Sequence, residues 1–91
     1  MMTMVQKPHP MDLKGIQRTY KFGNGLHVSA IKTLFSYGGK NNLWEIAVMD
    51  GEDGGFVTRN FFDVDDDVIG HLDENELFEH LKIVSEASWK K

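Results

Sequence analysis

The chain contains no cysteine, which excludes disulfide bonds, thiolate metal sites and a cysteine nucleophile. It also lacks any apolar run close to the roughly 20 residues that a helix needs to cross a bilayer. The first ten residues lack the apolar centre of a signal peptide. Small secreted domains often depend on disulfides, so the absence of cysteine favours a reducing compartment. We therefore expect a cytoplasmic protein without membrane contact.

Basic residues are in the minority. Lys and Arg number 10 against 14 Asp and Glu, which gives a net charge of −4. Binding to a nucleic-acid backbone requires a surplus of basic residues on the binding face, so we expect no direct nucleic-acid contact. A basic protein partner is compatible with this charge. The length of 91 residues suits a single domain, and 41% hydrophobic residues is typical of a folded chain.

Alternating apolar residues predict four short strands. The central one covers 43–49 and places Trp44, Ile46 and Val48 on one fully apolar face. Glycine and asparagine residues predict tight turns between the strands. The other three strands are expected at 18–22, 26–34 and 56–61.

One helix is expected at the end of the chain. Asp73 is its predicted N-cap, and Glu76 stands at the position that completes a capping box. An apolar stripe at helical spacing follows and comprises Leu77, Phe78, Leu81 and Val84. We expect the helix to end near Ala87. The predicted fold is α+β: an antiparallel meander of about four strands with one C-terminal helix packed on one face.

The predicted domain organisation has three parts. Residues 1–15 are expected to form a flexible arm, because Pro8 and Pro10 exclude a helix or a central strand there. Residues 16–88 form a single α+β domain. Residues 89–91 are expected to be a short tail.

The acidic run before the helix is the strongest local signal. Asp63, Asp65 and Asp67 have the alternating spacing of a calcium loop, but Val68 stands where such a loop needs glycine. We therefore expect no metal ion, and a solvated turn that contacts a partner. Mimicry of a phosphate backbone is an alternative, which the mild net charge does not favour.

No group of residues predicts catalysis. His27 and Ser29 share one face of a strand, but no nucleophile or oxyanion motif accompanies them. The glycines lie between predicted strands, so they do not form a phosphate-binding loop. We expect neither an enzyme nor a cofactor.

Several short motifs resemble those of a group of small uncharacterised bacteriophage proteins. They are Phe22-Gly23-Asn24-Gly25, Ser36-Tyr37-Gly38-Gly39, Leu43-Trp44-Glu45 and Asp66-Asp67-Val68-Ile69-Gly70. The resemblance spans roughly residues 20–82. It implies a phage origin and a location in the host cytoplasm, and it carries no catalytic residue.

We therefore interpret the chain as a small acidic, non-enzymatic protein-binding module whose partner is a host or phage protein. The phage resemblance points to binding or inhibition of a host factor. Aromatic residues outside the core can anchor a partner. The candidate contacts are Asp63, Asp65, Asp66, Asp67, Tyr37 and Trp89. The alternative is a homo-oligomeric structural module that pairs through Leu43, Ala47 and Met49.

Overall fold

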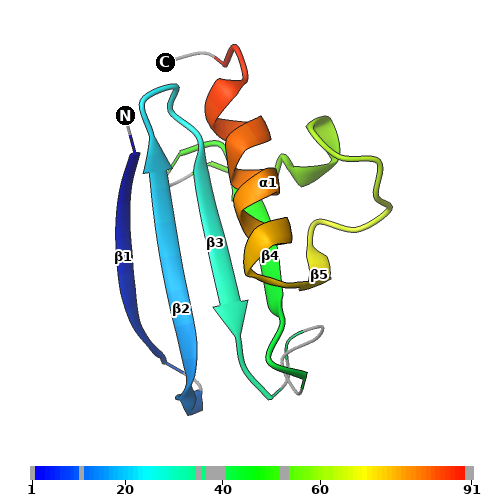
Figure 1. The fold of residues 1–91 in the computed structure, drawn as a ribbon. Coiled ribbons are helices and arrows are strands. Elements are labelled where there is room, and N and C mark those ends of the chain that lie inside the picture. The colour runs from blue at the N-terminus through cyan, green and yellow to red at the C-terminus, as the bar shows by residue number, and fades with distance from the viewer. Residues whose placement is uncertain (1, 11, 35, 37–40, 52–53, 90–91) are drawn as a thin grey trace.

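The computed structural model describes residues 2–10, 12–34, 36, 41–51 and 54–89. Five strands form one antiparallel sheet in chain order, and one helix covers part of one face (Figure 1). The predicted α+β fold is confirmed, with one strand more than expected. The elements are β1 (Met2–His9), β2 (Asp12–Phe22), β3 (His27–Lys32), β4 (Trp44–Met49), the 3-10 helix η2 (Thr58–Asn60), β5 (Ile69–Leu72) and α1 (Glu74–Glu86).

The core lies between α1 and one face of the sheet. Trp44, Ile46 and Val48 of β4 are all buried there, as the alternation of the central strand predicts. The helix contributes Leu77, Leu81 and Val84 to the same core. Phe78 was predicted to widen this stripe, and that prediction is wrong, because its side chain is 53% exposed.

The start of α1 agrees with the predicted capping box. The side chain of Asp73 accepts a hydrogen bond from the backbone N–H of Glu76 at 2.7 Å. In return, the carboxylate of Glu76 accepts from the N–H of Asp73 at 3.0 Å. These bonds satisfy amide groups that have no partner within the helix. The helix ends at the cap residue Ala87, as expected.

The first part of the chain differs from its prediction. Residues 2–9 form β1 and residues 12–15 begin β2, so the expected flexible arm over 1–15 is wrong for both segments. β1 pairs with β2 from Met2 opposite Phe22 to His9 opposite Asp12. Proline cannot complete a ladder on both sides of a strand, but an edge strand needs only one side. β1 is such an edge, and this position accommodates Pro8.

The predicted strand at 56–61 is also wrong. Phe56 makes an isolated bridge to Met49, after which the chain turns into η2. Thr58 is fully buried, and its hydroxyl accepts the N–H of Val48 at 2.9 Å and donates to the C=O of Asp67 at 2.6 Å. The Thr58 hydroxyl thus accepts the Val48 N–H, which a neighbouring strand would otherwise bind. β5 pairs with β4 instead.

The turn between β2 and β3 holds the end of the helix. The side-chain amide of Asn24 donates to the C=O groups of Val84 at 2.9 Å and Ala87 at 3.1 Å. Its oxygen accepts the N–H of Leu26 at 3.0 Å. The last carbonyl groups of a helix have no partner within it. The Asn24 side chain bonds two of these carbonyl groups from the neighbouring turn and so caps the C-terminal end of α1.

Replacement of Asn24 by alanine is expected to lower the free energy of unfolding by about 1–3 kcal/mol, because three hydrogen bonds are lost. Urea denaturation monitored by circular dichroism measures this change. The matched control is Asn75→Ala at an exposed position of α1, where alanine favours the helix and stability should not fall. Equal stability of the two variants would contradict the capping role of Asn24.

Candidate functional site

The helix covers only part of its face of the sheet. α1 packs against β4 and β5, and β1 lies at the opposite edge of the sheet (Figure 1). Residues paired across neighbouring strands share a face, so Met2 and Met4 of β1 lie on the same side as Phe22 and Tyr20 of β2. This is the helix side. The helix-side face of β1 therefore carries methionine side chains that α1 does not bury.

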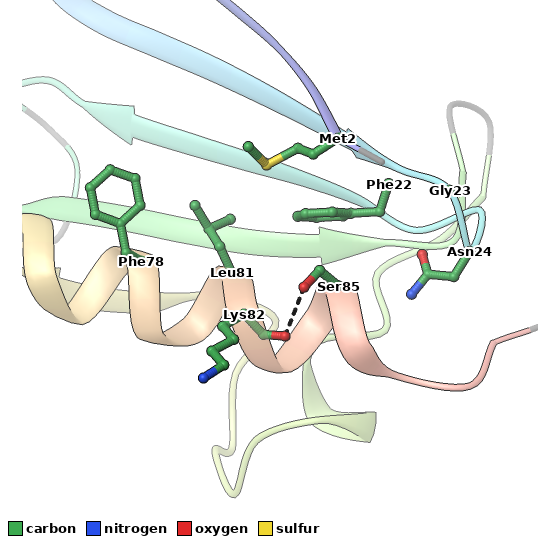
Figure 2. A pocket seen from close by; sticks show the side chains of 8 residues that line it. All are labelled: Met2, Phe22, Gly23, Asn24, Phe78, Leu81, Lys82 and Ser85. Atoms are coloured by element: carbon green, nitrogen blue, oxygen red, sulfur yellow. Dashed lines mark hydrogen bonds between the residues drawn. The ribbon is translucent and has the colours of Figure 1, made fainter.

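A groove of about 530 Å³ lies between α1 and the first two strands. We call it the α1–β1 groove. Figure 2 shows Met2 and Phe22 on the strand side, facing Phe78 and Leu81 on the helix side. Its lining residues are Met2, Phe22, Gly23, Asn24, Phe78, Leu81, Lys82 and Ser85.

The chemistry of the groove is that of an apolar contact surface. Met2 is 49% exposed and Phe78 is 53% exposed, and Leu81 lies between them as a buried floor residue. Lys82 is the one charged lining residue, and the hydroxyl of Ser85 donates to the C=O of Lys82 at 2.9 Å. No lining residue is an acid, a histidine or a cysteine. The groove can therefore accept apolar side chains.

A second cluster ties β1 to the other end of the helix. Arg18 of β2 donates to the side-chain oxygen of Gln6 at 2.8 Å and lies 3.2 Å from the carboxylate of Glu74. Its guanidinium is also 4.4 Å from the centre of the Trp44 ring. The side chains that meet here come from β1, β2, β4 and α1.

The electrostatics of this cluster favour the charged form of Arg18. Burial lowers the pKa of the guanidinium, but hydrogen bonds and charge interactions with Tyr20 and Glu74 outweigh burial. The pKa of Arg18 is therefore raised above its ordinary value. An arginine with a raised pKa keeps its positive charge across the ordinary pH range, so the guanidinium itself does not switch.

The outer edge of β1 is the second exposed feature near the groove. β1 stands first in the sheet order and pairs with β2 alone among the described strands. Seven of its eight residues are exposed. Lys7 is the only Lys, Arg, Asp or Glu in the strand. Such an edge presents backbone N–H and C=O groups that can pair with another chain.

The acidic residues singled out in the sequence lie elsewhere. Asp63, Asp65 and Asp66 are exposed and Asp67 is half-buried. They belong to the segment between η2 and β5, which lies at the sheet edge opposite β1 (Figure 1). Asp67 forms an ion pair with Arg59 at 3.5 Å, and Asp66 accepts the N–H of Asp67 at 2.7 Å. Within the described ranges, no three His, Asp or Glu side chains are placed to hold a metal ion.

Trp89 is part of the domain, so the prediction of a tail over 89–91 is wrong at this residue. Its indole N–H donates to the carboxylate of Asp50 at 2.9 Å. Its ring also packs on Phe61 at a centroid distance of 5.2 Å. These contacts occupy much of the side chain that was proposed as a partner anchor. Tyr37, the other aromatic candidate, lies outside the described residues.

The opposite, open face of the sheet carries His27 and Ser29. His27 lines a shallow pocket of about 300 Å³. The other lining residues are Val5, Lys7, Thr19, Lys21 and Met49, none of which is an acid that could orient a histidine base. Ala47 of this face is buried, and Leu43 and Met49 are half-buried, so they provide little exposed area for oligomerisation.

Comparisons with family models, with curated proteins and with solved structures each find no match to the chain. The resemblance to bacteriophage proteins therefore stays a prediction. No helix in the described part of the chain is long and apolar enough to cross a membrane.

Replacement of Trp89 by alanine should reduce stability by about 1–3 kcal/mol, because apolar burial and one hydrogen bond are lost. Phe78→Ala is the matched control, since it removes an aromatic ring that is largely exposed and should change stability by less than about 0.5 kcal/mol. Thermal unfolding of both variants checks the difference. A Trp89→Ala variant as stable as the wild type would restore the interpretation of 89–91 as a tail.

Proposed function

We propose that the chain is a non-enzymatic protein-binding module and that its working surface is the α1–β1 groove. The observation that carries this proposal is the gathering of exposed apolar side chains from two elements, Met2 and Met4 of β1 and Phe78 of α1. Small domains seldom leave large apolar side chains together without a partner. Met4, which is 46% exposed, extends the apolar surface along β1 beyond the groove lining.

The composition of the groove favours a protein over a small polar substrate. Methionine side chains are flexible and polarizable, and binding surfaces that adapt to partner side chains use them often. The only charged lining residue, Lys82, points its side chain away from Met2 and Phe22 (Figure 2), so a partner with apolar side chains fits the groove best. The resemblance to bacteriophage proteins directs the proposal to a host protein, in the cytoplasm, as the bound or inhibited factor.

The acidic residues Asp63 and Asp65 are a second proposed contact. Both are exposed, and they suit a basic surface on the same or another partner. They lie at the edge of the sheet opposite β1 (Figure 1). Substitutions in the groove and in the acidic segment therefore affect separate surfaces.

The test is affinity capture from a lysate with tagged wild type and three variants, followed by mass spectrometry and a binding titration of the captured protein. Phe78→Ser should weaken binding at least about tenfold, because an exposed aromatic wall of the groove is removed. Ile83→Ser is the matched control, since Ile83 is also an exposed apolar residue of α1 but does not line the groove. Equal loss in both variants, or no loss in Phe78→Ser, would refute the groove as the contact.

The third variant, Asp63→Asn with Asp65→Asn, separates the two surfaces. If the groove carries the interaction, this variant should retain binding within about threefold at high salt, where exposed charges are screened. Loss of binding in this variant at low and high salt, with binding intact in Phe78→Ser, would move the contact to the acidic segment. Circular dichroism of each variant verifies that the fold is intact.

A further inference from the structure

We propose that the outer edge of β1 pairs with β1 of a second copy of this chain. The two strands would run antiparallel and join the two five-stranded sheets into one continuous sheet with a twofold axis. This inference goes beyond the proposed function, because it concerns the edge of β1 and not the groove, and other variants test it.

The edge of β1 is unprotected over most of its length. Monomeric proteins prevent edge pairing with charged residues, prolines and bulges. In β1 all three stand at one end, as Lys7, Pro8 and the register shift between Pro8 and His9. The segment from Met2 to Gln6 contains none of them. All five residues of this segment are exposed, and alternate residues direct their backbone N–H and C=O groups away from β2, where a second strand can pair with them.

The sequence of this segment is complementary to itself. In an antiparallel pair centred on Met4, that residue opposes Met4 of the second copy, and Thr3 opposes Val5. Thr and Val are β-branched and pair well across strands. The paired segment is uncharged, so no like charges meet, although each chain has a net charge of −4. Lys7 and Pro8 fall outside this pairing.

The same register buries apolar surface on both sides of the sheet. Met4 is 46% exposed on the helix side, and Val5 is 59% exposed on the open side. Pairing covers part of each with the second copy. On the helix side it brings the two α1–β1 grooves together across the twofold axis, because Met2 and Met4 lie on that side.

A second copy fits this edge better than a helix from another protein. A helix can fill the groove, but all of its backbone hydrogen bonds are internal, so it leaves the N–H and C=O groups of the β1 edge unpaired. A strand satisfies them, and the segment Met2–Gln6 is a strand whose pattern matches its own. The interface is short, so the dimer should dissociate on dilution.

The absence of cysteine makes a single introduced thiol a clean probe. Residues directly opposed in an antiparallel pair have Cα atoms about 4.5–5.5 Å apart, which a disulfide can bridge. Met4→Cys should therefore give a covalent dimer as its main product under mild oxidation. Lys7→Cys is the matched control on the same strand, because its two copies would lie about 20 Å apart along the strands. Equal cross-linking of the two variants would overturn the pairing, and so would the absence of cross-linking in Met4→Cys.

Sedimentation equilibrium gives an independent test without oxidation. The wild type should show a concentration-dependent dimer, and Met4→Lys should be monomeric, because two lysines would then face each other across the axis. Ile83→Lys is the control, since it adds the same charge at an exposed site of α1 and should leave the dimer intact. A wild type that stays monomeric at every concentration would refute this inference. It would leave the groove proposal standing wherever Phe78→Ser still loses the captured protein.

Discussion

The rest of the structure depends on the contacts that the indole ring of Trp44 makes. It is 1% exposed in β4, and its N–H donates to the carboxylate of Glu74 at 3.1 Å. Arg18 of β2 and Lys32 of β3 place their charges 4.4 and 4.3 Å from the ring centre. Each such cation–π contact contributes about 0.5–2 kcal/mol. Because Glu74 is the first residue of α1, its bond to Trp44 joins the start of the helix to β4.

The position of the helix then determines which surface stays open. A helix is about 10–12 Å wide and neighbouring strands are about 4.8 Å apart, so one helix cannot cover the full width of a five-stranded sheet. This sheet has five strands, and α1 packs on β4 and β5. The helix-side face of β1 is thus left with Met2 and Met4 exposed. The groove is a geometric result of placing a single helix on a sheet wider than itself.

Elements with a regular hydrophobic period can be predicted from the sequence. The prediction fails where the hydrogen bonding of a single residue changes the local structure. β4 and α1 follow from periods of two and 3.6 residues, together with the capping box. Pro8 argues against a central strand, but it does not exclude the edge position that β1 occupies. The buried hydroxyl of Thr58 replaces a ladder bond, which no propensity shows. A helical wheel places Phe78 on the apolar stripe, but the wheel does not reveal how much of the sheet the helix covers. In the structure the side chain is exposed.

The order of the strands has a consequence for how fast the chain folds. Every strand in the sheet pairs with its neighbour in sequence, and α1 packs against β4 and β5, which are the two strands that precede it. Contacts between elements close in sequence require little loop-closure entropy, and chains rich in them fold quickly. The sheet can grow by successive hairpins without a long-range search. β1 contributes no side chain to the core, so the core can form before β1 pairs with β2.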